Sequence, residues 1–382
     1  MDFAWTREQL ILKESIIAFA REQLNDRVIE RDRAGEFDRE AWDRCAAFGL
    51  PGLTIPVEYG GQGYDPLTAM LALEGLGYGC TDNGLVFVLN NHLWSCAISI
   101  LDFGTEAQKQ RYLPPMCRGE LIGGQVLTEP ESGSAAFTMR TTAARDGDAY
   151  VLNGTKTFLT NAPIGDVFIV YARTDEVRGV QEGFSAFIVT RDLPGLSLTK
   201  EWEKSGLRTA PMGQLTFDNC RVPAERLLGA EGMGYSVFQS TIEWERSFFF
   251  ASQVGVMERL LDRSIDYAQQ RRQGGKPIGS FQAISHKLVD MKLRIELAKL
   301  LLYKIGWLKR EGRLAFLEAS LAKLFISESH VQASLDAIQI HGARGYMTEY
   351  EIERELRDAV AGTLYAGTSE IQREIIAGLL GL

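Results

Sequence analysis

Apolar residues recur at helical spacing at both ends of the chain, whereas its middle alternates in the manner of β-strands. In the first 120 residues, apolar positions three and four apart predict a series of helices. These helices are expected at 6–34, 39–49, 67–78, 84–102 and 106–118. The Gly-rich stretch GGQG at 60–63 follows no strand pattern, so a turn between helices is a better interpretation than a phosphate loop.

From about 121 to 228 the pattern favours β-structure. β-branched and aromatic residues alternate or cluster in short segments, and turn signals such as LPG separate them. The expected strands are 149–154, 156–161, 167–173, 184–190, 196–200 and 214–222. This pattern predicts a compact antiparallel domain of the barrel or sandwich type.

After Pro223 the helical period returns and continues to the end of the chain. Helices are expected at 235–272, 280–310, 313–341 and 350–360, with a terminal helix near 369–380. Helices, then strands, then helices is an α+β order, which disfavours a doubly wound sheet of the NAD-binding kind. We expect three domains: a helical domain at 1–120, a β domain at 121–228 and a helical domain at 229–382.

Composition narrows the possible partners. The 382 residues carry a net charge of −9, which argues against nucleic acid because phosphate binding requires a basic face. The start MDFAWTREQL lacks a signal pattern and no uninterrupted apolar run reaches membrane-spanning length, so we expect a cytoplasmic protein without membrane insertion. The five cysteines share no CxxC spacing and the four histidines are scattered, which predicts reduced thiols and no metal site.

The segment TIEWERSFFFASQVGV at 241–256 places two carboxylates in apolar, aromatic surroundings. In a helix, Glu245 shares a face with Ile242, Phe248 and Phe249, where desolvation would raise its pKa toward the range of a general base. The alternative is that its side chain reaches the surface along its apolar stem. Glu243 points elsewhere, toward Arg246, and can stay ionised by pairing with this arginine.

Several turns carry groups that could hold a ligand. LTEPESGSA at 127–135 offers backbone donors and a hydroxyl, and KTFLTNA at 156–162 offers the Phe158 ring and the Thr160 hydroxyl on one side of a strand. RRQGGKPIG at 271–279 combines three cations with a tight turn, as a phosphate anchor would. Each of these segments alone is as typical of an ordinary turn or a solvated face.

Together, in this order, the segments resemble the acyl-CoA dehydrogenase family over essentially the whole chain. The resemblance rests on IPVEYGGQG, LTEPESGS, NGTKTFLTNA, FDNCRVPAERLLG, QIHGARGY and YAGTSEIQ. It implies an N-terminal helical domain, a middle β domain and a C-terminal four-helix bundle, assembled as a homotetramer with FAD in each subunit. In such enzymes a carboxylate removes the α-proton of an acyl thioester and flavin N5 takes a hydride from the β-carbon. An electron-transfer flavoprotein or oxygen then accepts the electrons.

The resemblance also implies individual site residues. Phe158 stands where the family has a flavin-stacking tryptophan. The positions that match cofactor contacts are Leu127, Thr128, Gly133, Ser134, Phe158, Thr160, Arg271, Gln273, Gln339, Gly342, Ala343, Thr368 and Glu370. Of these, Arg271, Gln273, Gln339, Gly342 and Ala343 match residues that reach FAD across a subunit interface. The positions that match contacts to the pantetheine arm of the substrate are Ser134, Glu243 and Arg246.

Two positions depart from the common family pattern together. Most members carry the catalytic glutamate directly before the glycine of the final GTS-type motif, where this chain has Ala366. A minority carry it on the first long C-terminal helix before an arginine, which is the position of Glu245. The missing acid at one position and the acid at the other together favour Glu245 as the catalytic base.

The substrate class follows from a narrower resemblance. WERSFFF at 244–250, GCTDNGLVF at 79–87 and TNAPIGDVFIVYA at 160–172 resemble a branch that oxidises acyl groups on carrier proteins in secondary metabolism, prolyl groups among them. A carrier-protein thioester is therefore the first expectation, and a short or branched free acyl-CoA is the alternative. A flavoenzyme that is not a dehydrogenase and a non-catalytic scaffold on the same fold are further alternatives.

Overall fold

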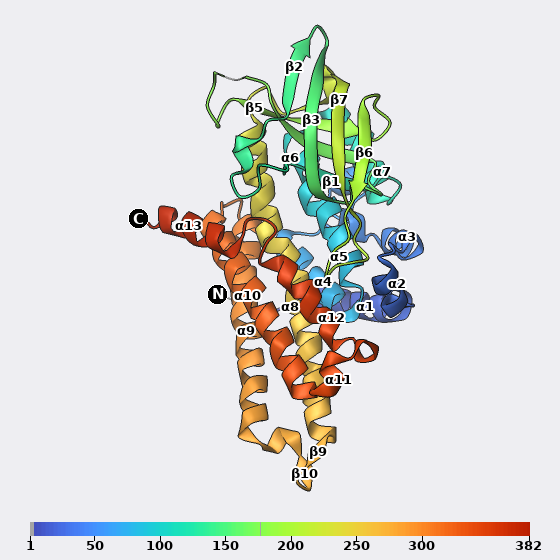
Figure 1. The fold of residues 1–382 in the computed structure, drawn as a ribbon, viewed down its shortest axis with the longest axis vertical. Helices are drawn as coiled ribbons and strands as arrows, with labels where there is room; N and C mark the ends of the chain where they lie inside the picture. Colours follow the sequence, from blue (N-terminus) through green and yellow to red (C-terminus); the bar gives the residue numbers. More distant parts are fainter. Residues whose placement is uncertain (1–3, 176) are drawn as a thin grey trace.

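The structure is a computed structural model and describes residues 4–175 and 177–382. Residues 1–3 and 176, which belong to the expected first and second domains, lie outside it. Figure 1 shows a β-sheet at one end of an elongated molecule, long C-terminal helices reaching the other end, and the N-terminal helices packed beside both. This order of helices, strands and helices is the one that the sequence predicts.

The N-terminal region is helical, with breaks that the sequence pattern did not show. Its helices are α1 (Arg7–Gln23), α2 (Val28–Ala34), α3 (Arg39–Phe48), α4 (Pro66–Gly79), α5 (Asn83–Asn90), α6 (Ile98–Phe103) and α7 (Glu106–Cys117). The single helix expected at 6–34 was wrong, because Arg27 has a left-handed backbone (φ 48°) that separates α1 from α2. At 60–63 the chain forms the expected turn, in which Gly60 and Gly63 have positive φ angles.

One apolar helical stretch lies at the centre of this region. The helix α5, a π-helix η3 (Asn91–Ala97) and α6 continue into one another. This stretch, Asn83–Phe103, is long and apolar enough to cross a membrane, with a mean hydropathy of 1.5 over its most apolar window, although polar residues such as Asn91 and His92 interrupt its apolar run. However, 83% of that window is buried inside the protein, as in the core helix of a globular domain.

The middle region is a mixed sheet with the strand order β6-β7-β3-β2-β4-β5-β8. Its strands are β1 (Gly123–Val126), β2 (Thr142–Asp146), β3 (Ala149–Thr160), β4 (Val167–Arg173), β5 (Phe184–Thr190), β6 (Leu196–Glu201), β7 (Met212–Pro223) and β8 (Leu227–Leu228). The expectation of a purely antiparallel domain was wrong, because β1 pairs with β4 in parallel. Pairing direction is set by the path of the connecting chain, which a strand pattern does not contain.

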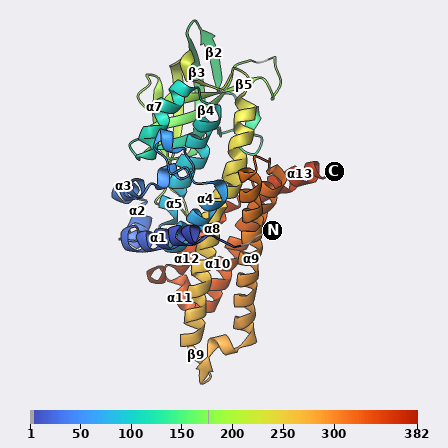
Figure 2. The same ribbon diagram turned by 180° about the vertical axis from the view of Figure 1, so that it is seen from behind.

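The C-terminal helices form a bundle around one long helix. The helices are α8 (Gly234–Gln270), α9 (Gln282–Arg310), α10 (Phe316–His341), α11 (Ala343–Tyr346), α12 (Ile352–Gly362) and α13 (Ser369–Leu379), with a short β9–β10 hairpin (Arg272–Gln273, Lys276–Pro277) at the far tip. Figure 2 shows α8 running from the sheet through the bundle to this hairpin. The central position of α8 brings its side chains into contact with all three regions.

Two glycines set the contact between α4 and α8. A Cβ atom added to Gly77 would lie 1.9 Å from the backbone oxygen of Ser252, and one added to Gly255 would lie 2.0 Å from that of Glu74. Only glycine allows two helix backbones to approach so closely. The contact fixes α8 against the N-terminal region two turns beyond Glu245.

Candidate active site

Glu245 lies on the buried face of α8 that the sequence predicts. Its neighbours Ile242, Phe248 and Phe249 are buried, and Glu245 itself is only 7% exposed. Its Oε1 atom is buried and has no hydrogen-bond partner. The alternative that this side chain reaches the surface is therefore wrong, and the carboxyl group sits in apolar surroundings with one oxygen free.

Burial changes the acidity of this carboxyl group. Desolvation raises the pKa of Glu245 to about 7, while the Ser95 side chain and the Arg246 charge act in the opposite direction. Burial also raises the pKa values of Tyr171 and Tyr365, and the negative charge of Glu245 adds to both shifts. A carboxyl group with a pKa near neutral is suited to act as a general base.

Glu243, two residues earlier, has different contacts. Its Oε1 atom lies 2.8 Å from Nζ of Lys309 on α9 and accepts a hydrogen bond of 3.1 Å from the backbone N–H of Ala315. The expected pair with Arg246 was wrong, because this face of α8 meets the turn between α9 and α10, where a lysine supplies the charge. A contact between Glu243 and the pantetheine arm stays a prediction.

Arg246 connects α8 to the turn that carries Ala366. Its Nε atom donates to the Ala366 carbonyl oxygen at 3.0 Å, and the Gln372 amide donates to the same oxygen at 3.1 Å. Ala366 itself has a left-handed backbone (φ 54°), which costs energy in a residue other than glycine and is held here by these bonds. Two segments that lie more than a hundred residues apart in sequence thus meet beside Glu245.

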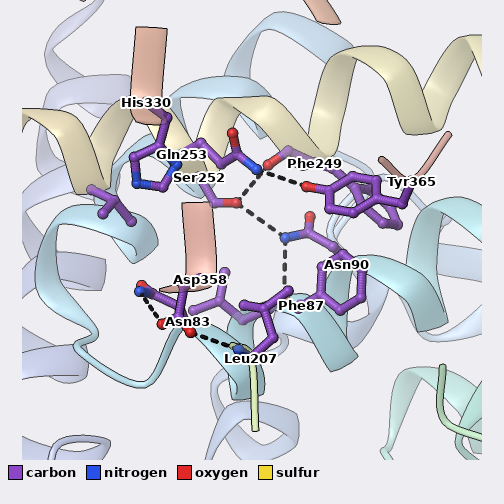
Figure 3. Close-up of a pocket in the computed structure, with 12 residues that line it drawn as sticks. Asn83, Phe87, Asn90, Leu207, Phe249, Ser252, Gln253, His330, Asp358 and Tyr365 are labelled. Carbon is purple, nitrogen blue, oxygen red and sulfur yellow. Dashed lines mark hydrogen bonds between the residues drawn. The ribbon is translucent and has the colours of Figure 1, made fainter. Parts of the chain in front are cut away.

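Aromatic side chains and a small cavity lie beyond Glu245. Phe87, Phe249 and Tyr365 form edge-on and tilted ring pairs with centroids 4.9–5.8 Å apart. Behind them is a cavity of about 30 Å³, large enough for water and lined also by Gln253 and His330 (Figure 3). The Gln253 amide donates to the Tyr365 hydroxyl at 2.7 Å and so holds the ring in place. Besides burial, the charge of Glu245 raises the pKa of Tyr365, so this ring cluster lies close to the carboxyl group.

The 127–135 loop is held by a buried ion pair. Glu129 lies 3.0 Å from Nζ of Lys156, and the same amine donates to the Leu127 carbonyl oxygen at 2.8 Å. The backbone N–H of Thr157 donates to the Thr128 carbonyl oxygen at 2.9 Å. Leu127 and Thr128 are thereby fixed beside β3, whereas Gly133 and Ser134 further along the loop are exposed.

Phe158 and Thr160 lie at the end of β3, where the pairing with β7 shifts between Lys156 and Leu159. Phe158 is 54% exposed with a left-handed backbone (φ 56°), and its ring packs at 5.0 Å on that of Trp202. Trp202 in turn donates from Nε1 to Thr157 Oγ1 at 3.1 Å. The result is an exposed aromatic platform next to the fixed loop.

The remaining predicted cofactor positions fall into two further places. Arg271 and Gln273 lie at the end of α8 and in β9, and Gln339, Gly342 and Ala343 lie where α10 ends and α11 begins; the labels of β9 and α11 both stand toward the far end of the bundle (Figure 1). There the Tyr267 and His341 rings stack at 4.5 Å. Thr368 caps α13 by accepting a hydrogen bond of 3.3 Å from the Ile371 N–H, and Glu370 follows it on the surface. A single subunit therefore does not gather all of the predicted cofactor residues.

Four residues at the site did not emerge from sequence reasoning. They are Ser95, Trp202, Lys309 and Tyr365, which contact or face the predicted groups. Ser95 offered one signal, because a polar residue inside the apolar run 84–102 must find a partner when it is buried. The others could not be identified, since nothing local in the sequence shows what they face.

The comparisons with known proteins agree with this geometry. The chain matches "Acyl-CoA dehydrogenase, N-terminal domain" at residues 6–120, the corresponding middle domain at 124–220 and the C-terminal domain at 232–380. It is 45% identical over 347 residues, 91% of each chain, to an L-prolyl-[peptidyl-carrier protein] dehydrogenase of Pseudomonas fluorescens.

Solved structures agree as well. The prolyl acyl carrier protein oxidase AnaB superimposes with a TM-score of 0.98 at 50% identity, covering 99% of this chain and 100% of AnaB. A structure of PigA with FAD and proline superimposes with a TM-score of 0.97 at 37% identity, covering 100% of both chains. With matches to all three domains and to whole relatives, this chain belongs to the acyl-CoA dehydrogenase family.

Proposed function

We propose that this protein is an FAD-dependent dehydrogenase that oxidises the α,β-bond of an acyl thioester carried on a carrier protein, with Glu245 as the base. The observation that carries the proposal is the buried Glu245 carboxyl group, with one oxygen unpartnered, next to a turn where the common position of the base is occupied by Ala366. An alanine cannot accept a proton, so the base must come from elsewhere in the site.

The residues present fit a flavin. Phe158 exposes a flat ring beside a loop whose backbone is fixed by the Glu129–Lys156 pair. A Cβ atom added to Gly133 would meet nothing within 4 Å, so a ligand can approach the backbone there. Leu127, Thr128, Ser134 and Thr160 would line the ring of the cofactor. When bound, FAD supplies the acceptor for the hydride that leaves the β-carbon.

Residues of the protein itself would remove the α-proton of the substrate. Glu245 is desolvated, so its basicity is raised toward that of the α-carbon of a polarised thioester. Its free Oε1 atom is the acceptor. Arg246 holds the 366 turn against α8. We assign Arg246 and Ser134 to contacts with the pantetheine arm, as their positions in the family imply. The aromatic side chains Phe248 and Phe249 keep water from the carboxyl group.

A prolyl group on a carrier protein is the substrate that we propose, in secondary metabolism. The support comes from relatives named as prolyl-carrier-protein enzymes at 45% and 50% identity. The aromatic rings of Phe87, Phe249 and Tyr365 pack against one another near Glu245, which favours a small acyl group over a long one. A free short-chain acyl-CoA is the alternative, because a short-chain specific acyl-CoA dehydrogenase of Clostridium acetobutylicum is also 35% identical over 99% of both chains.

We further propose a homotetramer in the cytoplasm. About 26 residues of α8 separate Glu245 from Arg271, which at 1.5 Å per residue is about 39 Å, farther than one FAD molecule reaches. A second copy would therefore bring its 271–273 and 339–343 segments to the cofactor. On α9, Val289, Leu293, Leu297 and Leu300 form one exposed apolar stripe that a second copy would cover. An electron-transfer flavoprotein or oxygen would accept the electrons.

The test is an anaerobic reduction screen with purified, FAD-loaded protein. Prolyl and short-acyl carrier-protein thioesters are compared with their CoA counterparts, and flavin absorbance is followed. We expect bleaching with the prolyl carrier thioester, which Glu245→Gln abolishes while its FAD content is unchanged. Bleaching by CoA thioesters alone would favour the alternative substrate. Yellow protein that no thioester bleaches would indicate another flavin chemistry, and protein that takes up no FAD would indicate a scaffold.

A further inference from the structure

A π-helix runs beside the part of α8 that carries Glu245. The seven residues of η3 (Asn91–Ala97) have π-helical hydrogen bonding, and Ser95 within it is fully buried. π-helical segments are rare and concentrate at functional sites, since they re-aim side chains relative to an ordinary helix. The π-helix therefore decides how the Ser95 side chain is oriented relative to Glu245.

Two hydrogen bonds set the register between this segment and α8. Ser99 and Thr241 share a hydrogen bond of 2.8 Å between their hydroxyl groups, and the Asn90 amide donates to Ser252 Oγ at 3.2 Å. Residue numbers rise along one segment and fall along the other, so the two run antiparallel. Ser95 lies between the two contacts on its segment, and Glu245 lies between them on α8. The two residues therefore sit at the same level.

Trp94 fixes this register at the level of Ser95. Its ring stacks on Trp244 at 5.6 Å with an interplanar angle of 9°, and packs on Phe248 at 4.3 Å. Its indole N–H donates to Asn90 Oδ1 at 3.0 Å. Trp244 and Phe248 stand on either side of Glu245 in α8, so Trp94 leaves little freedom to its neighbour Ser95.

Asn91 determines how the Ser95 hydroxyl is used. The Asn91 amide donates to Ser95 Oγ at 3.3 Å, so the oxygen of the hydroxyl serves as the acceptor in this pair. The hydroxyl hydrogen is then left for another acceptor. Ser95 is also the side chain whose hydrogen bonding opposes the effect of burial on the pKa of Glu245. Ser95 therefore lies between Asn91, which donates to its oxygen, and Glu245, which sits at the same level of α8.

We propose that Asn91 and Ser95 are positioning residues for the base: Asn91 holds the Ser95 hydroxyl, and Ser95 restrains the Glu245 carboxylate so that its free oxygen faces the substrate α-carbon. This inference rests on the proposed function. A desolvated carboxylate without such a donor would be more basic but free to rotate away from the substrate. The pair sets the orientation of the base and limits the rise of its pKa.

The experiment compares three single variants in the FAD-loaded enzyme. The first measurement is the pH dependence of flavin reduction by the prolyl carrier thioester in single turnovers. The second is an infrared pH titration without substrate, which follows the band of the protonated Glu245 carboxyl group. This band is identified by its loss in Glu245→Gln. For Ser95→Ala we expect the pKa from both measurements to rise by about one unit, since a hydrogen bond to the charged form is lost. Asn91→Ala should shift it in the same direction by less. Ser99→Ala is the matched control, because it removes a buried hydroxyl of the same apolar stretch that pairs with Thr241.

The outcomes separate this inference from the function on which it rests. An unchanged profile for both Ser95→Ala and Asn91→Ala, or an equal shift for Ser99→Ala, would overturn the positioning role and leave the base assignment intact. If Ser95→Ala does not fold, Asn91→Ala decides the question alone. Flavin reduction that persists in Glu245→Gln would instead overturn the proposed function.

Discussion

Glu243 and Glu245 lie two residues apart on the same helix, yet their surroundings differ. Glu243, 2% exposed, has a lysine at 2.8 Å and a backbone N–H at 3.1 Å. Glu245, 7% exposed, has aromatic neighbours and an unpartnered oxygen. A buried carboxylate with a full set of partners is stabilised as an ion, whereas one without them becomes a stronger base. The comparison shows that the partners that each carboxyl group meets, rather than burial itself, set the two acids apart.

Substitutions of the two carboxylates should differ most in their effect on the rate of flavin reduction. Glu245→Gln should lower the rate of flavin reduction by a factor of about 10³ or more, because the proton acceptor is removed. Glu243→Gln should keep the rate at saturating substrate within about tenfold, since its carboxylate faces Lys309. Rapid-reaction absorbance measurements on both variants give the comparison. Equal losses in the two variants would mean that both acids take part in the chemistry.

Removing the partner of Glu243 should affect stability rather than chemistry. Lys309→Met leaves a buried carboxylate without its cation and should destabilise the protein by about 3 kcal/mol. Denaturant unfolding of the FAD-loaded enzyme measures this loss. The double variant Lys309→Met with Glu243→Gln is the control and should recover much of the loss, because no uncompensated charge is left. A double variant as unstable as the single one would show that packing of the lysine stem, and not its charge, is what matters.

The pH dependence of protein stability tests the raised pKa of Glu245. The pKa of Glu245 is raised from about 4.3 in the unfolded chain to about 7, so between these values the folded protein holds a proton that the unfolded chain has released. The contribution of Glu245 to the free energy of unfolding therefore decreases as the pH rises through this window, by up to about 3 kcal/mol above pH 7. Glu245→Gln should melt at the same temperature as the wild type near pH 5 and several degrees higher near pH 8. A constant difference between the two proteins across this range would contradict the raised pKa.

Trp244, between the two acids, should have the smallest effect. Its ring stacks on Trp94 at 5.6 Å and lies 4.0 Å from Nζ of Lys309. Trp244→Phe keeps an aromatic ring but weakens both contacts, for an expected loss of about 1 kcal/mol in unfolding free energy. Differential scanning fluorimetry at fixed FAD concentration would measure it. A loss above that of Lys309→Met would show that Trp244, rather than the ion pair, holds this part of α8.

Local patterns predicted much of the fold. The long helices α8, α9 and α10 lie close to the ranges expected from apolar spacing, and β4 and β5 were found from their β-branched runs. The parallel pairing of β1 with β4 was missed, because pairing direction depends on a connection rather than on composition. The break at Arg27 was missed for a related reason, since an isolated left-handed residue leaves no periodic signal.

The sequence likewise predicted one part of the candidate site and missed another. Apolar neighbours at helical spacing marked Glu245 as buried, and the alanine at 366 pointed to it as the base. The partner of Glu243 was predicted wrongly, because Arg246 is close in sequence whereas Lys309 approaches from another helix. Ser95 was not identified, since its orientation depends on a π-helix that no propensity distinguishes from an α-helix.

By itself, the sequence determined which residues are apolar, where the long helices and most of the strands form and which acid has aromatic neighbours at helical spacing, because these properties arise between neighbours along the chain. Only the tertiary structure decided which carboxylate receives a cation and which keeps an unpartnered oxygen. Those contacts join segments far apart in sequence, and their geometry is set by how α8 packs between the N-terminal helices and the C-terminal bundle.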